Sequence, residues 1–281
     1  MSIELGTNAK RALFEDSYKA AYQAMGPDLR PYVTFREQMG VDTYKFRTMG
    51  RGMAQARGAS QSNLNTLGVA HGTVEATVES WYASELTDIF DQDKTNAPQE
   101  IPALAKVLAG ATKRRETQLV IDALYAATIA ARNQVGTGSD GLTVAKLVAA
   151  RAALKANDIM ETPTLLLTEK QEADLLALTA FTSADFAASG GATTGNVRQG
   201  HFGFNYVLVG TGRDEDGLKI LSGDDRTIFA FVPSAVGLVC GLNKTEVNYE
   251  SASASWRSTS MLRAGAVVID PLGVVEILCD E

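Results

Sequence analysis

The chain has 281 residues, of which 45% are hydrophobic, so it can bury one large core or two smaller ones. Its formal net charge of −7 argues against sequence-specific reading of nucleic acid, which normally requires a basic surface. The chain begins without the basic and apolar regions of a signal peptide, and no window approaches 18 consecutive apolar residues. The sequence therefore predicts a soluble protein made in the cytosol and not secreted by the usual route.

Apolar residues at helical spacing predict an amphipathic helix over Ala9–Met25. Phe14, Tyr18 and Met25 share one face of this helix, and Gly26-Pro27 ends it. The apolar face has two alternative partners. The helix either docks on its own core or forms an arm that docks on a neighbouring subunit.

The next segment separates its charges into two adjacent blocks. Thr43–Val74 contains four basic residues and no acid, whereas Glu75–Asp93 contains six acids and no base. The basic block also contains five glycines and a polar run over Gln55–Thr66, which has too few large apolar residues to form a core. Two adjacent blocks of opposite sign indicate a contact surface.

Two strands flank this polar run. Thr43–Thr48 and Thr73–Val78 roughly alternate polar and apolar residues and are rich in β-formers, so they predict a long arm with two strands at its base. An arm that cannot bury its backbone polar groups must satisfy them in water or on a neighbour. The complementary charges favour a neighbour of the same kind.

Two helices are expected after the acidic block. Pro98 opens the first, which is interrupted at Gly110, and the second runs over Thr112–Asn133. The glycine-rich segment 136–141 that follows is predicted to be a subdomain boundary.

The central part of the chain mixes helix and strand. Thr143 is a candidate N-cap for a helix to about Asn157, and Thr164–Leu167 reads as a buried strand. Thr168 and Gln171 have the spacing of a capping box, which launches a further helix. This mixture predicts an α+β fold.

The C-terminal part is predicted to be mostly strand. Strands are expected at Phe202–Val209 and Thr227–Val232, followed by a helix of small residues over Pro233–Cys240. Ala264–Ile269 and Val274–Leu278 flank a Pro-Leu-Gly turn, which predicts a C-terminal hairpin.

No constellation of residues points to catalysis, a cofactor or a metal. The sequence has no nucleophile elbow, P-loop or complete dinucleotide fingerprint, and its two histidines lack metal-ligand spacing. The carboxylate runs read as solvated charge rather than Ca²⁺ or Mg²⁺ ligands, and the cysteines read as buried free thiols. The residues concerned are His71, His201, Gly210-Thr-Gly212, Asp88, Asp91, Asp93, Asp214, Glu215, Asp216, Cys240 and Cys279.

The order of these parts resembles the major capsid proteins of tailed phages, which have the Hong Kong 97-like fold. The motifs that carry the resemblance are 81–91 (WYASELTDIFD), 119–124 (LVIDAL), 164–171 (TLLLTEKQ), 200–204 (GHFGF) and 273–277 (GVVEI). The resemblance implies an N-terminal arm over 1–33, an extended loop over 34–83, a peripheral domain with the spine helix over 84–142, an axial domain over 143–255, and a C-terminal hairpin over 256–281 that returns to the peripheral domain.

The function implied by this resemblance is structural rather than enzymatic. The chain would be a major capsid (head) protein that forms hexamers and pentamers in an icosahedral shell around phage double-stranded DNA, bound without sequence specificity. It would assemble in the host cytoplasm and become part of the virion, with scaffold, portal and decoration proteins as further candidate partners. No cofactor and no membrane are expected.

The charged blocks then become candidate contacts between subunits. We expect bases of the arm to meet acids of a neighbour, and the residues concerned are Lys45, Arg47, Arg51, Arg57, Glu75, Glu79 and Glu85. One alternative is a related shell, an encapsulin-like compartment or a gene-transfer particle. Another is a soluble enzyme in which Thr43–Val74 closes over a pocket as a lid.

Overall fold

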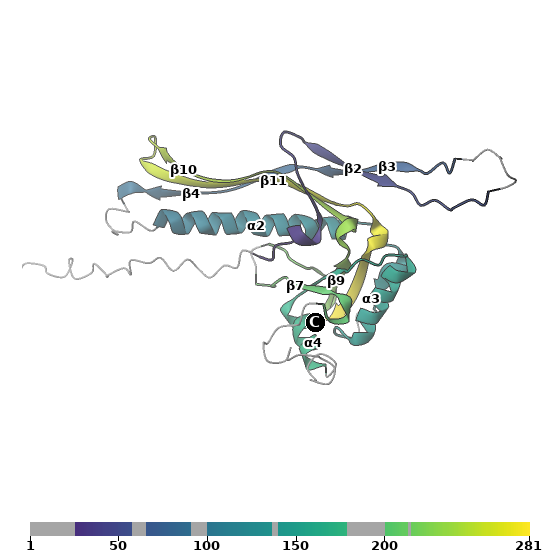
Figure 1. Ribbon diagram of the computed structural model, residues 1–281. Helices are drawn as coiled ribbons and strands as arrows, with labels where there is room; N and C mark the ends of the chain where they lie inside the picture. Colours follow the sequence, from purple (N-terminus) through teal and green to yellow (C-terminus); the bar gives the residue numbers. More distant parts are fainter. Residues whose placement is uncertain (1–25, 58–65, 91–99, 137–139, 179–199, 213–214) are drawn as a thin grey trace, which may run out of the picture.

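A computed structural model describes residues 26–57, 66–90, 100–136, 140–178, 200–212 and 215–281. The helix predicted over Ala9–Met25 lies outside the described residues. The described chain forms two lobes and a projecting arm (Figure 1). We call them the long lobe, the compact lobe and the arm.

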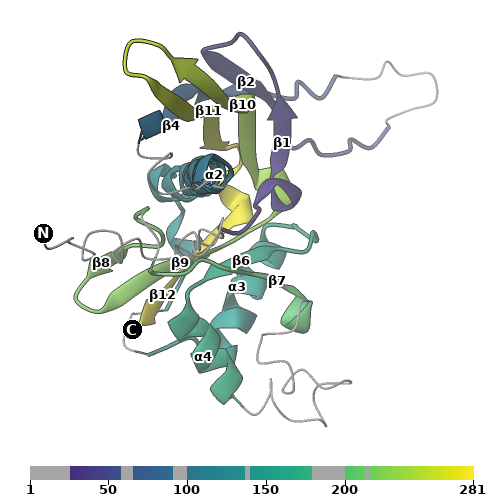
Figure 2. The same cartoon turned by 90° about the vertical axis from the view of Figure 1, so that its left-hand side faces the viewer.

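The long lobe is a four-stranded sheet lying over one long helix. The strand order is β1 (Thr34–Glu37), β10 (Val236–Glu250), β11 (Ser255–Val268) and β4 (Glu79–Asp88), with β1 parallel to β10 and the other pairs antiparallel. Helix α2 (Glu100–Ala126) runs beneath the sheet, and Figure 2 shows it nearly end-on. A separate apolar cluster forms beneath this sheet, where Leu262 and Ala264 of β11 pack with Trp81 and Leu119.

Helix α2 corrects the predicted break at Gly110, because it continues through that glycine. A glycine inside a helix costs about 1 kcal/mol relative to alanine, and burial of the neighbouring side chains offsets this cost. The helix ends at Ala126, earlier than the predicted Asn133, which instead closes a short 3₁₀ turn, η2 (Ala131–Asn133). The side chain of Asn133 donates to the backbone oxygens of Leu272 and Val274, and this holds the turn against that segment of the chain.

The compact lobe contains a mixed sheet and two shorter helices. Its sheet has the order β5 (Gln134–Val135), β12 (Val274–Asp280), β9 (Asp225–Phe231), β6 (Thr164–Leu167) and β7 (Asn205–Leu208), with β8 (Ile220–Ser222) beside β9. Helices α3 (Val144–Ala156) and α4 (Glu169–Ala177) pack with this sheet. The main hydrophobic core lies here, and Val120, Ile121 and Leu124 of α2 join it.

Three local features of the compact lobe agree with the sequence-based predictions. Thr143 caps α3, its side chain accepting from the backbone N–H of Lys146, and Asn157 ends that helix. The capping box at α4 is confirmed, because the backbone N–H of Thr168 donates to Oε1 of Gln171 at 3.0 Å. Residues Thr164–Leu167 form the fully buried strand β6, as predicted.

The predicted C-terminal hairpin is wrong. Its two strands exist, but β11 pairs with β10 and β4 in the long lobe, whereas β12 pairs antiparallel with β9 and parallel with β5 in the compact lobe. The turn between them is a 3₁₀ turn, η6 (Pro271–Gly273), which carries the chain from one lobe to the other. The segment 274–280 therefore belongs to the compact lobe.

The helix predicted over Pro233–Cys240 is also wrong. Only the 3₁₀ turn η5 (Pro233–Ala235) is helical, and β10 begins at Val236. Val236 and Val239 are fully buried, and their β-branched side chains suit a strand packed on both faces. Residues 236–250 therefore lie in the long lobe, in contrast to the predicted 143–255 domain.

Two further strands and one turn differ from the sequence-based expectation. The acidic stretch was not predicted to be a strand, yet β4 is the edge of the long sheet, and β1 forms the opposite edge. The strand expected at Phe202–Val209 begins later, as β7, after the 3₁₀ turn η4 (His201–Gly203). Gly200 and Gly203 have positive φ angles around this turn, which prevents an extended start.

Candidate assembly surfaces

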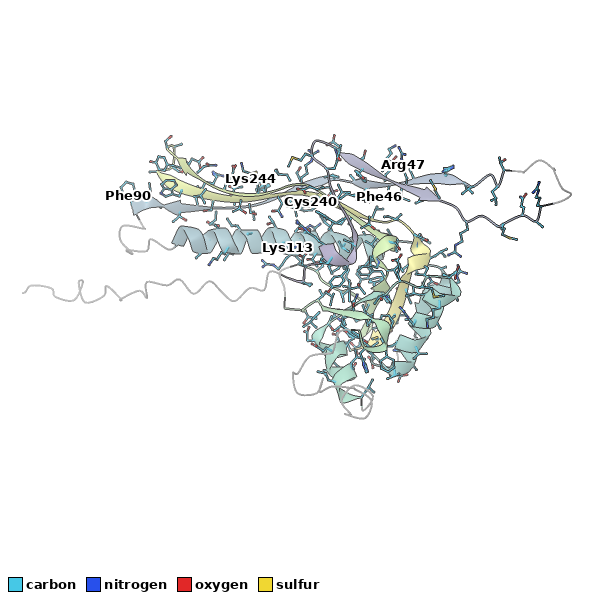
Figure 3. All side chains as sticks on the ribbon, in the orientation of Figure 1. Phe46, Arg47, Phe90, Lys113, Cys240 and Lys244 are labelled. Carbon is cyan, nitrogen blue, oxygen red and sulfur yellow. The ribbon has the colours of Figure 1, made fainter. Side chains whose placement is uncertain are left out.

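The arm is a two-stranded antiparallel hairpin that projects from the long lobe (Figures 1 and 3). We define the arm as residues 43–57 and 66–77, in which β2 (Thr43–Met49) pairs with β3 (His71–Thr77). These strands confirm the two predicted at its base. Beyond them the backbone bond from Gly50 N–H to Ala70 O, 2.8 Å long, continues the pairing. The arm points away from the body, so in the described residues it does not close over a pocket as a lid.

One aromatic side chain anchors the base of the arm. Phe46 is 6% exposed and packs in a small cluster with Ala76, Val78 and Val239. Its ring lies on Gly237 of β10, where a Cβ atom would stand 2.5 Å from the nearest ring atom. Only glycine leaves room for the ring at this point. The arm is thereby attached to the body by a very small core.

The chain also crosses the sheet closely where the arm returns to β4. A Cβ atom on Gly265 of β11 would stand 2.0 Å from the backbone oxygen of Thr77. Glycine at this position lets the exit strand of the arm lie directly against β11. Glycines 237 and 265 therefore allow both strands at the base of the arm to lie close against the long sheet.

Two of the predicted contact residues pair with each other inside one chain. Lys45 and Glu75 lie directly opposite in the hairpin register, and Nζ of Lys45 is 2.5 Å from Oε1 of Glu75. Both side chains are more than half exposed, so the pair is worth about 0–1 kcal/mol. An intramolecular partner thus explains these two charges without a neighbouring subunit.

The three arginines of the arm differ in their surroundings. Arg51 donates from Nη2 to the backbone oxygen of Asn157, at the end of α3 in the compact lobe of the same chain. Arg47 and Arg57 are exposed, and no charged partner contacts either of them within the described part of the chain. These two remain candidates for contacts with another copy.

The remaining predicted acids lie on β4. Glu79 and Glu85 are exposed on this strand, and neither forms an ion pair with any residue that the structure describes. Within the described ranges β4 pairs with β11 on one side only, so its other side is an open sheet edge. An open edge presents unpaired backbone groups that another chain can bind. The structure does not bring these acids close to the arm's own arginines.

A cavity of about 180 Å³ lies beside this edge, and sequence reasoning assigned it no role. Trp81 and Arg115 are among its lining residues, and the guanidinium carbon of Arg115 stands 3.9 Å from the indole centroid. Arg115 Nη1 is also 3.3 Å from a carboxylate oxygen of Glu215. The Nε1 atom of Trp81 is buried without a hydrogen-bond acceptor among the described residues. A tryptophan within an acidic strand is the sequence signal that could have revealed this site.

Charged residues also attach the segment before β1 to helix α2. The Arg30 guanidinium makes two bonds to the Glu116 carboxylate, at 2.6 and 2.9 Å, and Nζ of Lys113 is 2.8 Å from Oδ1 of Asp28. The hydrogen bond to Glu116 raises the pKa of Arg30. Burial alone would raise the pKa of Asp28, but hydrogen bonds from Lys113 and the Arg30 backbone hold it below its ordinary value of 3.8.

The positions considered for metal binding form no such site where the structure describes them. Asp91, Asp93 and Asp214 lie outside the described residues, and Asp88 accepts a bond from the backbone N–H of Phe90 at 2.8 Å. Within the described ranges no group of three His, Cys, Asp or Glu side chains could hold a metal ion. Cys240 and Cys279 are buried free thiols, as predicted.

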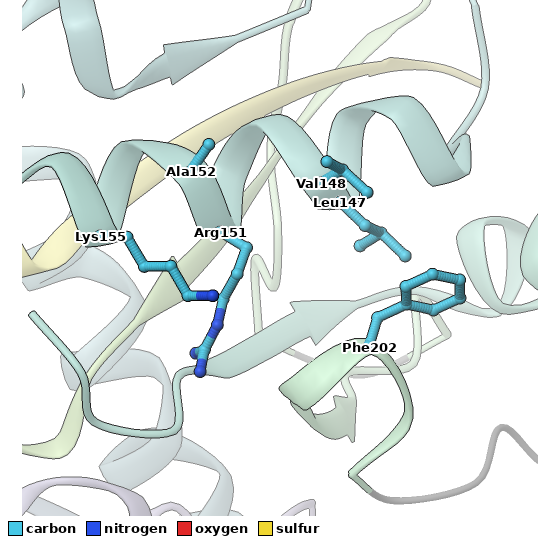
Figure 4. Close-up of a pocket in the computed structure, with 6 residues that line it drawn as sticks. All are labelled: Leu147, Val148, Arg151, Ala152, Lys155 and Phe202. Carbon is cyan, nitrogen blue, oxygen red and sulfur yellow. The ribbon is translucent and has the colours of Figure 1, made fainter.

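A second cavity, of about 200 Å³, lies on the compact lobe (Figure 4). Leu147, Val148, Arg151 and Lys155 of α3 line it on one side, and Phe202 of η4 closes the other. Phe202 has a backbone φ angle of 51°, which residues other than glycine rarely adopt.

No helix among the described residues is long and apolar enough to span a membrane.

The comparisons with known proteins bear on the whole of this architecture. A family model described as "Phage capsid protein" matches residues 7–281. The chain belongs to the phage capsid protein family. Its role is that of a major capsid protein, as the resemblance in the sequence implied. Proteins of this family are structural components of the virion rather than enzymes.

Solved structures show the same fold at low sequence identity. The head protein of Helicobacter pylori bacteriophage KHP40 aligns with a TM-score of 0.74 at 10% identity, covering 99% of each chain. The capsid protein of cyanophage P-SCSP1u aligns with a TM-score of 0.71 at 15% identity, covering 94% of this chain and 91% of that one. No curated protein matches the chain in sequence.

The capsid of a GTA particle shares the fold as well. The capsid of a native GTA particle aligns with a TM-score of 0.68 at 12% identity, covering 95% of this chain and 94% of that one. At such identity the similarity establishes the fold alone. The Hong Kong 97-like α+β fold expected from the sequence is therefore confirmed, with its long helix and sheet, its compact lobe and its extended hairpin.

Proposed function

We propose that copies of this chain assemble through their arms into hexamers and pentamers of a closed icosahedral shell that holds double-stranded DNA. The observation that supports this most is the exposure of the arm. Met49, Met53 and Leu67 are 74%, 82% and 51% exposed on it. Burying such side chains on a neighbouring copy removes apolar surface from water at roughly 25 cal/mol per Å².

The charges of the arm select where it docks. Arg47 and Arg57 are exposed bases of the arm that lack a charged partner in the described chain, and the open β4 edge carries Glu79 and Glu85. We therefore assign the inter-subunit pairing to these four residues rather than to Lys45 and Glu75. Each exposed pair contributes about 0–1 kcal/mol, so stability comes from repetition over many identical contacts.

The enclosed DNA needs no base-specific contacts in this function. A net charge of −7 keeps the shell from condensing on its contents, and binding without sequence specificity is what a container requires. Scaffold, portal and decoration proteins remain further candidate partners, and assembly takes place in the host cytoplasm. The GTA match favours a second candidate, the shell of a gene-transfer particle.

Electron microscopy together with size-exclusion chromatography of the purified full chain tests self-assembly. We expect closed shells, or flat pentamers and hexamers that convert to shells. A monomer or dimer at every salt and protein concentration would contradict the proposal. Nuclease treatment followed by sequencing of the protected DNA distinguishes a phage genome from host fragments, and an encapsulin-like compartment would instead contain protein.

Charge reversal tests the docking assignment. The double change Arg47→Glu with Arg57→Glu should lower the yield of shells and make those formed more sensitive to salt, because like charges then meet at the β4 edge. Adding Glu79→Lys and Glu85→Lys should restore assembly. The same reversal at Arg132, an exposed arginine of the compact lobe, is the matched control. Normal yield and salt tolerance for the double variant would disprove the electrostatic part.

A further inference from the structure

Two buried amide side chains meet at the junction between the two lobes. Asn133 and Asn157 are 0% and 2% exposed, and Nδ2 of Asn157 donates to Oδ1 of Asn133 at 3.1 Å. We call this pair the amide hub. Asn133 belongs to the turn after α2, and Asn157 ends α3. The hub therefore joins the long helix of one lobe to a helix of the other.

The same two amides also bind the turn η6, which connects β11 to β12. Nδ2 of Asn133 donates to Val274 O at 2.9 Å and Leu272 O at 3.1 Å, and Nδ2 of Asn157 donates to Leu272 O at 3.0 Å. Buried amides with satisfied donors fix local geometry, because each lost bond would leave a buried carbonyl without a partner.

The turn η5, where the chain crosses from the compact lobe to the long lobe, is bound to the turn η6, where it crosses back. The turn η5 lies between β9 and β10, and its Ala235 oxygen accepts from the N–H of Ile269 at 2.7 Å. The N–H of Val232 donates to Gly273 O at 3.1 Å. A Cβ atom on Gly273 would stand 2.6 Å from Cβ of Ala235, so the two turns are in direct contact. The turns η2, η5 and η6, which carry the described chain between the lobes, thus meet around the hub.

The arm reaches this junction through one residue. Arg51 lies just beyond β2, and its Nη2 atom donates to the backbone oxygen of Asn157. That oxygen is at the C-terminal end of α3, where the helix dipole favours a positive charge. Arg47, four residues earlier on β2, contacts no charged group of the compact lobe in the described chain. Arg51 therefore provides the arm with a second attachment, remote from the small Phe46 cluster at its base.

We infer that Arg51 is a positioning residue for assembly, because it fixes the direction in which the arm leaves the body relative to the compact lobe. A hairpin attached only by its base could pivot about the Phe46 cluster and the two glycines 237 and 265. A second attachment to the interlobe junction restricts that pivot. It also couples the arm's direction to the angle between the lobes. The inference rests on the proposed function, since the arm's direction matters only if a neighbouring copy receives it.

We call the bond from Arg51 to the Asn157 oxygen the latch, and distance measurement in the unassembled chain tests it without reference to shells. Spin labels are placed on cysteines introduced as Met53→Cys and Ala149→Cys, both exposed positions, while the native thiols are buried. At low protein concentration we expect one narrow distance distribution between arm and α3. Arg51→Met should broaden it and should also lower the yield of closed shells. Arg47→Met, the matched control on the same hairpin, should leave the distribution narrow.

The outcomes separate the two proposals. A narrow distribution in Arg51→Met would overturn the latch, whatever happens to assembly. A broadened distribution in that variant, with no shells from the wild-type chain, would uphold the latch and refute the proposed function. Arg51→Lys guards against a folding defect in the methionine variant. It retains a donor and a positive charge, so its distribution should lie between those of the wild-type chain and Arg51→Met, and a distribution as broad as the latter would count against the latch.

Discussion

The arm and the compact lobe bury phenylalanine side chains in very different ways. Phe229 and Phe231 of β9 are almost fully buried in the main core, where Phe229 also contacts Tyr125 at a centroid distance of 4.8 Å. Phe46, the largest buried side chain of the arm, packs instead in a cluster with only three other buried residues. The compact lobe has a large core of its own, whereas the arm is held to the body by the small cluster at its base and by the bond from Arg51 to Asn157.

This difference indicates what each region was selected to do. A segment whose apolar side chains are mostly exposed cannot be stabilised by its own chain, because too little surface leaves the water on folding. The compact lobe needs no partner by this criterion. The arm does, and a second copy of the same chain would supply one at every position of a closed shell.

The largest loss of stability is expected from a substitution in the compact lobe. Phe229→Ala should lower the free energy of unfolding by about 3–5 kcal/mol, because the lost ring leaves a cavity in a close-packed core. Urea denaturation of the unassembled chain measures this. Phe202→Ala is the control, since Phe202 is 38% exposed and should cost much less. Equal losses for the two variants would contradict the contrast between core and surface.

At the base of the arm we expect a smaller loss of stability than in the compact lobe but a large loss of assembly. Phe46→Ala should lower the free energy of unfolding by about 2 kcal/mol, because burial of one phenylalanine is lost from a small cluster. Hydrogen exchange should show faster opening of β2 and β3 while β9 and β12 stay protected. Shell yield, counted by electron microscopy, should fall sharply. Normal assembly by this variant would show that the base anchor is dispensable.

The smallest effect is expected in the segment before β1, where the titration of Asp28 should make stability depend on pH in the acid range. The pKa of Asp28 is lowered in the folded chain, so its contribution is complete above the ordinary value of 3.8 and is lost as the pH falls through the lower, folded value. Stability of the wild-type chain should therefore decline more steeply below pH 3.8 than that of Asp28→Asn. Parallel curves in acid titrations followed by circular dichroism would rule out a role for the Asp28–Lys113 pair.

Much of the local structure was predictable because its causes are local. The caps Thr143 and Thr168 act within three residues, and the strands at the base of the arm follow from alternation and β-branched side chains. The open β4 edge was not predicted, because polar and apolar residues alternate only weakly in this acidic strand. Its pairing partner, β11, also lies about 170 residues further along the chain. The pairing of Lys45 with Glu75 within one chain was not predicted, because the hairpin register was not known.

Features that depend on contacts between residues far apart in the chain could not be predicted without the tertiary structure. Gly110 reads as a helix break, yet burial on several sides keeps α2 continuous through it. The Pro-Leu-Gly turn at 271–273 reads as a hairpin turn, yet it carries the chain between two sheets, because every buried side chain of β12 fits the compact core and β11 is already paired on both edges. Arg51 could not be distinguished from Arg47 and Arg57 without knowing that α3 ends beside it.

By itself the sequence determined the class of fold, the charged and exposed character of the arm, and the absence of a catalytic pattern, because composition, periodicity and capping act over short distances. The tertiary structure alone decided which strands share a sheet, which charges are already paired within one chain, and where the arm meets the junction between the lobes. Those features depend on contacts between residues far apart in the chain, and their positions are fixed only when the whole chain packs.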